Sequence, residues 1–111
     1  DMTIWAVEPE NAAILSGGSV GTHLQMGIGD GLIPDILNTQ IYDHIQIVTD
    51  EEALQTAKDL ARLEGLMCGI SSGSNVAAAQ KLAKKLGKGK TVVTILPDTA
   101  ERYFSTPLFE D

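Results

Sequence analysis

The chain has 111 residues, enough for one small domain, and its 43% apolar and 21% charged residues are ordinary for a soluble globular protein. The net charge of −7 argues against a nucleic-acid partner, because phosphate binding needs clustered Lys and Arg. No apolar run approaches the roughly 18 residues of a membrane span, and no signal peptide is visible. The single cysteine, Cys68, cannot form an internal disulfide, which fits a reducing cytoplasm.

The expected elements alternate between strand and helix along the chain. They are a strand at 4–7, a short helix at 11–15, a glycine-rich loop at 16–40, a strand within 41–49, a helix from 49 to 63, a short strand at 66–70, a turn at 71–74, a helix at 75–86, a central strand at 91–96 and a partly helical tail. Such alternation predicts an α/β fold with a mainly parallel sheet and flanking helices.

The clearest local signal is the segment Thr49-Asp50-Glu51-Glu52. It has the capping-box pattern, and its acidic residues stand where the helix dipole favours negative charge. The amphipathic pattern that follows predicts a helix that stops at Gly65.

The loop Gly27-Ile28-Gly29-Asp30-Gly31-Leu32-Ile33-Pro34 has three alternating glycines. Such glycines let the backbone approach a ligand closely or adopt positive φ. A dinucleotide fingerprint would need glycine at position 32 and a strand directly before the loop, and neither condition holds. A plain structural turn is the alternative to a binding loop.

The segment Ser71-Ser72-Gly73-Ser74 lies between a predicted strand and a predicted helix. Hydroxyls there suit a pyridine nitrogen or a carboxylate. Helix capping by Ser72 or Ser74 is the structural alternative, and the two roles are compatible.

Other chemistry-bearing residues indicate no site. His23 and His44 are isolated, and no spacing of His, Cys and Asp is typical of zinc. The lysines from Lys81 to Lys90 cluster at a helix end and turn, as on a solvated surface.

Taken together, these segments resemble the cysteine synthase (O-acetylserine sulfhydrylase) family. The resemblance is collinear over the whole chain and is carried by Val7-Glu8-Pro9-Glu10, His23 with the 27–34 loop, Glu64-Gly65-Leu66, Gly69-Ile70-Ser71-Ser72-Gly73-Ser74, Ile95-Leu96-Pro97-Asp98 and Glu101-Arg102-Tyr103-Phe104-Ser105-Thr106. It implies a two-domain type II pyridoxal-phosphate (PLP) enzyme fold, of which residues 1–111 would be the C-terminal part of the large cofactor-binding domain.

The resemblance also implies site residues. Ser71 matches the serine that hydrogen-bonds the pyridine nitrogen, Pro97 matches a residue beside the ring, and Gly27 matches a position near the cofactor. Gly27, Ile28, Gly29, Asp30 and Gly31 match the loop that lines the substrate site. The family's Schiff-base lysine and phosphate-binding loop lie in a segment that this chain does not match, so we expect no catalytic residue here and an inactive fragment in isolation.

A serine on the ring nitrogen leaves the cofactor less electron-withdrawing than a carboxylate would. This suits elimination followed by addition, and the resemblance implies O-acetylserine and sulfide as substrates, with cysteine and acetate as products. One departure is Met26, where cysteine synthases often carry Gln; Gln25 precedes it. The departure leaves open a cystathionine β-synthase or an O-phosphoserine-dependent relative.

The expected assembly also follows from the resemblance. A homodimer is implied, and cysteine synthases dock the C-terminal tail of serine acetyltransferase in their active site, so a non-catalytic docking module is an alternative class. A nucleotide-binding module is a third possibility. With about four strands of a larger sheet, the chain should have a bare strand edge and an apolar face, which promote association into dimers or aggregates.

Overall fold

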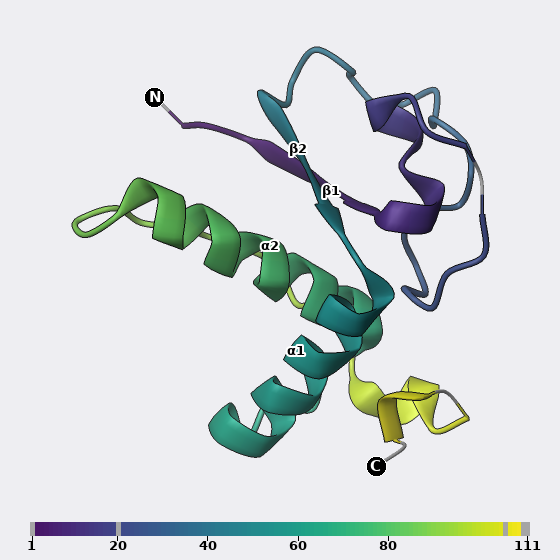
Figure 1. Ribbon diagram of the computed structural model, residues 1–111, viewed down its shortest axis with the longest axis vertical. Coiled ribbons are helices and arrows are strands. Elements are labelled where there is room, and N and C mark those ends of the chain that lie inside the picture. The colour runs from purple at the N-terminus through teal and green to yellow at the C-terminus, as the bar shows by residue number, and fades with distance from the viewer. Residues whose placement is uncertain (1, 20, 106, 110–111) are drawn as a thin grey trace.

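A computed structural model describes residues 2–19, 21–105 and 107–109 of the chain (Figure 1). Two strands, β1 (Trp5–Pro9) and β2 (His44–Val48), form a parallel pair in which Trp5 lies opposite His44 and Pro9 opposite Val48. Both strands were predicted. Their parallel pairing with each other, together with the helices that follow them in the chain, confirms the α/β class.

The helix expected at 11–15 is instead two short 3₁₀ turns, Glu10–Ala12 and Ile14–Ser16. Asn11 therefore lies inside the first turn and caps no helix. The buried Glu8 side chain explains this shape, because its carboxylate accepts hydrogen bonds from the backbone amides of Leu15 (2.6 Å) and Ser16 (3.2 Å) and so fixes the second turn. Gly17 ends that turn in the left-handed region, with φ of 85°.

The longest predicted helix is confirmed as α1 (Asp50–Glu64). The Thr49 side chain accepts from the Glu52 amide at 3.1 Å and the Glu52 carboxylate accepts from the Thr49 amide at 3.3 Å, so the capping box is complete. Gly65 then ends α1 in the left-handed region, with φ of 71°.

The second helix, α2, runs from Ile70 to Leu86 and is longer than predicted. The strand expected at 66–70 is wrong: only Cys68 pairs, in an isolated antiparallel bridge with Thr99. The turn expected at 71–74 is also wrong, because these residues form the first turn of α2. Burial explains the difference, since Ile70 is fully buried in the core and the small residues after it let α2 approach α1.

The two helices cross at their N-terminal ends, close to the end of β2 (Figure 1). Gly73 lies at this crossing, where an added Cβ would stand 2.1 Å from the carbonyl oxygen of Ala53. The core is built mainly around this crossing from small and medium side chains: Val48, Ala53, Ala57, Ile70, Ala77, Ala78, Ala100, Tyr103 and Leu108.

The strand expected at 91–96 has no ladder partner among the described residues, and the segment forms neither strand nor helix. Its apolar side chains are bare, with Val93 82% and Ile95 67% exposed. A sequence rich in β-forming residues forms a strand only where a neighbouring strand pairs with it. The segment is held to α2 by a hydrogen bond from Asn75 Nδ2 to the Ile95 carbonyl, at 2.9 Å. The bare apolar surface matches expectation, and association through it stays a prediction.

Beyond residue 99 the described chain forms two further 3₁₀ turns, Ala100–Tyr103 and Pro107–Phe109, which agrees with a partly helical tail. Within the described ranges, no helix has the length and hydropathy that a membrane crossing requires.

Candidate functional site

The glycine loop adopts the backbone conformation that its composition predicts. Gly27, Gly29 and Gly31 have φ of 95°, 66° and 83°, a region that other residues rarely occupy. Gly29 is also crowded, because an added Cβ would lie 2.6 Å from the Pro9 ring and 2.8 Å from His23 Nε2. Positive φ therefore favours glycine at all three positions, and space requires it at Gly29 as well.

Ser71 lies opposite this loop in the first turn of α2 and is only 3% exposed. Among the described residues its hydroxyl has no hydrogen-bond partner. A Cβ added to Gly27 would stand 3.9 Å from Ser71 Oγ, so the missing side chain leaves space directly in front of the hydroxyl. The fold thus brings together two of the three predicted cofactor residues.

The start of α2 differs from the capping arrangement weighed for its serines. The residue at the N-cap is Gly69, and no side chain makes a capping hydrogen bond there. Ser74 is a buried partner of Gln25 instead, and Ser72 is fully buried. Helix capping by Ser72 or Ser74 is therefore wrong, because both side chains lie past the cap, inside the helix.

Pro97 precedes Asp98, which lies beside the start of α2. The backbone carbonyl of Asp98 accepts a hydrogen bond from the backbone amide of Gly69 at 3.3 Å. The Asp98 carboxylate is held by a hydrogen bond from the Tyr103 hydroxyl. Pro97 itself is exposed. Three segments, the glycine loop, the first turn of α2 and the Pro97-Asp98 corner, thus meet around the N-terminus of one helix.

The loop residues Gly29, Asp30 and Gly31 also line a cavity of about 170 Å³, which Val7 and Glu8 of β1 complete from the other side together with further apolar side chains. Ile28 is half-buried, whereas Gly27 and Asp30 are exposed. The predicted substrate residues are therefore contiguous but do not all face one space.

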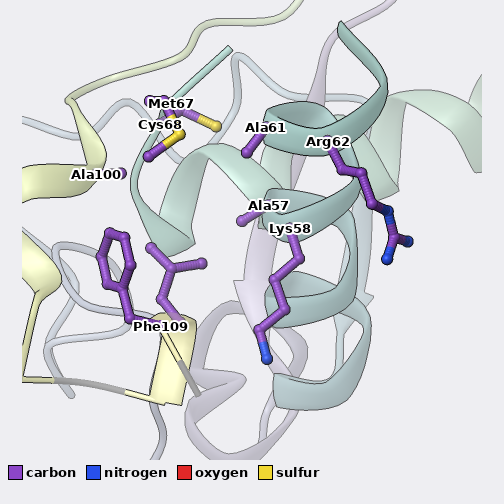
Figure 2. Close-up of a pocket in the computed structure, with 9 residues that line it drawn as sticks. Ala57, Lys58, Ala61, Arg62, Met67, Cys68, Ala100 and Phe109 are labelled. Atoms are coloured by element: carbon purple, nitrogen blue, oxygen red, sulfur yellow. The ribbon is translucent and has the colours of Figure 1, made fainter. Parts of the chain in front are cut away.

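A second cavity, of about 390 Å³, lies between α1, the 66–68 segment and the C-terminal turns (Figure 2). Its lining is mostly apolar: Ala57, Lys58, Ala61, Arg62, Met67, Cys68, Ala100, Leu108 and Phe109. Burial raises the pKa of the Cys68 thiol, which favours an inert core cysteine over a nucleophile. None of the predicted site residues lines this cavity.

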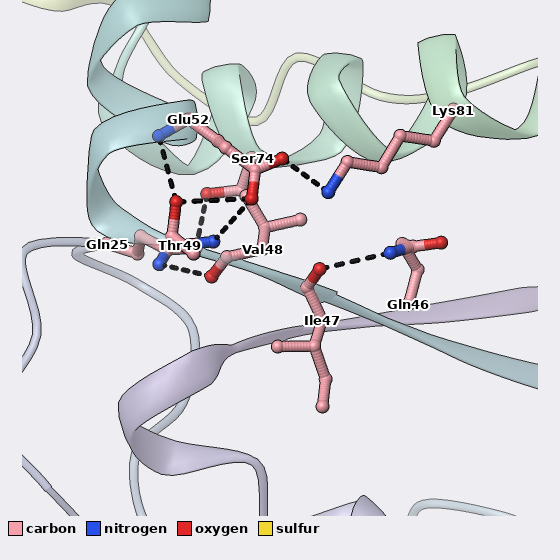
Figure 3. A network of polar contacts seen from close by, with 8 residues as sticks. All are labelled: Gln25, Gln46, Ile47, Val48, Thr49, Glu52, Ser74 and Lys81. Atoms are coloured by element: carbon pink, nitrogen blue, oxygen red, sulfur yellow. Dashed lines mark hydrogen bonds and ion pairs between the residues drawn. The ribbon is translucent and has the colours of Figure 1, made fainter.

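Sequence reasoning missed the polar network that Figure 3 shows behind the loop. Gln25 is fully buried and bonds Val48, Asp50 and Ser74. Beside it, Glu52 of α1 forms an ion pair with Lys81 of α2. Burial alone would raise the pKa of Glu52, but the bonds to Lys81 and Thr49 outweigh it and hold that pKa below its ordinary value. The only sequence signal was a glutamine within a glycine-rich stretch.

The structure also shows how position 26 differs from the glutamine that cysteine synthases often carry there. The Gln25 amide is directed into the protein, and Met26 is 45% exposed. Gln25 therefore does not take the place of the amide that the resemblance expects one position later, and a thioether stands there instead.

The lysines lie away from Ser71. Lys81, Lys84 and Lys85 are in the C-terminal half of α2, and Lys88 and Lys90 follow it. Lys81 is ten residues beyond Ser71, which is about 15 Å along a helix. Lys58 belongs to α1 and lines the 390 Å³ cavity. None of the five lysines from Lys81 to Lys90 lies in the first turns of α2 beside Ser71. No group of three or more His, Cys, Asp or Glu that would hold a metal occurs in the described ranges either.

A buried hydroxyl at a helix N-terminus, opposite a glycine loop, fits the nitrogen edge of a flat heteroaromatic cofactor, and comparison with known proteins defines the class. The model of the family described as "Pyridoxal-phosphate dependent enzyme" matches residues 1–98, and the chain belongs to this family. The family confirms the cofactor class that the resemblance implied.

Within this family, the chain is similar to curated cysteine synthases. The chain is 50% identical over 109 residues to a cysteine synthase of Staphylococcus aureus, covering 98% of this chain and 35% of that protein. It is 53% identical over 106 residues to "Cysteine synthase B" of Campylobacter jejuni, covering 96% and 35%. The chain thus spans about a third of the length of the curated relatives it matches.

Solved structures agree. Cysteine synthase from Entamoeba histolytica superposes with a TM-score of 0.95 at 42% identity, over 98% of this chain and 32% of that one. An O-acetylserine-dependent cystathionine β-synthase from Helicobacter pylori superposes with a TM-score of 0.90 at 39% identity, over 97% and 35%. The fold is therefore that of type II PLP enzymes.

Proposed function

We propose that this chain forms the ring-facing side of the PLP site in an enzyme that makes cysteine and acetate from O-acetylserine and sulfide. The observation that carries the proposal is the buried Ser71, whose hydroxyl makes no side-chain hydrogen bond among the described residues and lies 3.9 Å from where a Cβ of Gly27 would stand. The identities to cysteine synthases support the substrate pair.

Each residue has a distinct task in this proposal. When bound, PLP would supply the electron sink for loss of acetate from the substrate and addition of sulfide. Ser71 hydrogen-bonds the ring nitrogen as a neutral partner, so no carboxylate holds a proton there. Pro97 lies beside the ring, and Gly27 leaves room for its edge.

The substrate side of the site is formed by the loop from Gly27 to Gly31, in which Ile28 and Asp30 carry side chains. Alternate glycines leave backbone amides accessible, and these suit the carboxylate of an amino acid. In this proposal the chain is the C-terminal part of the large PLP-binding domain, and the anchoring lysine and phosphate loop come from elsewhere in the enzyme, because no segment of this chain matches the family's motifs for them.

The test is turnover by the whole enzyme that contains this chain, reconstituted with PLP and supplied with each donor and acceptor. We expect cysteine from O-acetylserine and sulfide. Replacing Ser71 by Ala should lower the rate by about three- to ten-fold, as for one lost hydrogen bond. Replacing Ser71 by Asp should lower it further, since a carboxylate favours a protonated ring nitrogen. Ser105→Ala is the matched control, because Ser105 is exposed, and its rate should equal that of the unmodified enzyme.

A second reaction has specific support, because the Helicobacter pylori relative forms cystathionine from O-acetylserine and Met26 departs from the cysteine synthase pattern. Formation of cystathionine with no turnover of sulfide would replace the leading proposal. Turnover of O-phosphoserine but not O-acetylserine would change the donor.

The proposal extends to a cytoplasmic homodimer and to a serine acetyltransferase tail that docks against the glycine loop. A peptide of that tail should compete with O-acetylserine in a titration of the whole enzyme. Binding without competition would place the docking surface elsewhere.

A further inference from the structure

Gln25 is a fully buried polar side chain that joins the glycine loop to three other parts of the fold (Figure 3). Its Nε2 donates to the Val48 carbonyl at 3.0 Å and to Asp50 Oδ1 at 3.0 Å. Its Oε1 accepts from the Ser74 hydroxyl at 2.7 Å. The residue thus contacts the end of β2, the start of α1 and the first turns of α2.

The orientation of the amide follows from these neighbours. The Val48 carbonyl and the Asp50 carboxylate only accept, so the NH₂ group must face them. That leaves the oxygen for Ser74, whose alternative acceptor, the Ile70 carbonyl, is farther away at 3.3 Å. Every strong hydrogen-bonding group of the buried amide is used, as burial of a polar group requires.

The loop backbone is held at the same place. The Leu24 amide donates to Asp50 Oδ2 at 3.1 Å, so both oxygens of Asp50 bind consecutive loop residues. The first residue of α1 is therefore a fixed anchor for the strand of loop that leads into Gly27.

His23 links Gln25 to the far side of the loop. The His23 Nδ1 accepts from the backbone N–H of Gln25 at 3.1 Å, so the ring is the tautomer with hydrogen on Nε2, which donates to the Gly29 carbonyl at 3.0 Å. Ser74 bonds the side chain of Gln25 and His23 bonds its backbone, so this path from Ser74 to Gly29 passes through Gln25 itself.

Two residues of this path, Ser74 and Gln25, are close in the chain to the two residues of the proposed cofactor site. Ser74 is three residues beyond Ser71 on one face of α2, and Gln25 is two residues before Gly27. We propose that Gln25 is a positioning residue: its bond to Ser74 sets the gap between Gly27 and Ser71 into which the cofactor ring fits. This inference rests on the proposed function of that site.

The experiment uses the PLP enzyme that contains this chain, with Gln25→Met, Ser74→Ala and the double variant. Gln55→Met is the matched control, because Gln55 is exposed and bonds only Asp59, one turn along α1. The readouts are amide hydrogen exchange with and without PLP, cofactor affinity from its fluorescence, and KM against kcat.

We expect exchange in residues 23–31 to rise about three- to ten-fold in Ser74→Ala, which loses one hydrogen bond to Gln25. The rise should be larger in Gln25→Met, which loses three side-chain hydrogen bonds, and α1 residues 58–64 should be unchanged in both variants. The PLP dissociation constant should rise by a similar factor. The double variant should be no worse than Gln25→Met alone, since the bond between Gln25 and Ser74 is already absent there. The control should match the unmodified enzyme.

Unchanged loop exchange and unchanged PLP affinity in Ser74→Ala would overturn the proposal, even if Gln25→Met failed to fold. Equal loss of protection in the loop and in α1 would also overturn it, because it indicates a general packing role. If the unmodified enzyme bound no PLP, the proposed function would fail, whereas loop exchange without cofactor would still decide whether Gln25 holds the loop.

Discussion

Replacing Gly73 by Ala tests the close approach of α1 and α2. The added Cβ would stand 2.1 Å from the Ala53 carbonyl oxygen, 2.9 Å from the Ala57 amide nitrogen and 3.0 Å from Ala57 Cβ. Two of these atoms are backbone, so no side-chain rotation relieves the clash, and the helices must separate by about 1 Å to restore ordinary contact.

Two effects of opposite sign set the magnitude. Alanine in a helix interior is about 1 kcal/mol more favourable than glycine. Overpacking of a core costs about 1–3 kcal/mol, and a backbone clash belongs at the upper end. We therefore expect a net loss of about 1–2 kcal/mol in the free energy of unfolding, with weaker PLP binding because Ser71 moves with α2.

Denaturant unfolding of the whole enzyme measures this loss, and Gly65→Ala is the control. Gly65 has φ of 71° but no atom within 4 Å of an added Cβ, so only backbone strain of about 1–2 kcal/mol applies there and PLP affinity should not change. A Gly73→Ala variant as stable as the unmodified enzyme, with unchanged PLP affinity, would show that α1 and α2 do not approach each other this closely at Gly73.

Three further predictions concern the helices and the cysteine. Thr49→Ala should lower the free energy of unfolding by about 1 kcal/mol, because the capping box of α1 is lost; an unchanged unfolding midpoint would contradict this. The lowered pKa of Glu52 contributes stability that is present above its unfolded pKa of about 4.5 and is lost as pH falls through the folded value, so Lys81→Met should flatten the acid side of a stability–pH curve, and an unaltered curve would argue against the ion pair. The raised pKa of Cys68 keeps its thiol protonated at neutral pH, so a thiol reagent at pH 8 should label the native enzyme much more slowly than the unfolded one; equal rates would show an exposed thiolate.

The features predicted correctly from the sequence are those that depend on local chemistry. The capping box of Thr49 and Glu52 and the helix end at Gly65 involve only neighbours in the chain. The glycine loop is similar, since positive φ at Gly27, Gly29 and Gly31 is a property of the residues themselves.

The errors came where tertiary packing decides. The start of α2 at Ile70 reflects burial against α1, which the run of serines conceals. The 91–96 segment has a strand composition, but no partner pairs with it in the described chain.

The candidate site was predicted in part. The fold brings Gly27 close to Ser71, 44 positions apart, and the resemblance identified both. Gln25 was missed because its role depends on Ser74, which is 49 residues away in the sequence, and no local pattern marks a glutamine as buried.

The most direct test of the central claim is a crystal structure of the whole enzyme with PLP bound. We predict Ser71 Oγ within about 3 Å of the pyridine nitrogen, with Gly27 beside the ring edge. A carboxylate or a different side chain on that nitrogen, with Ser71 remote from the ring, would contradict it.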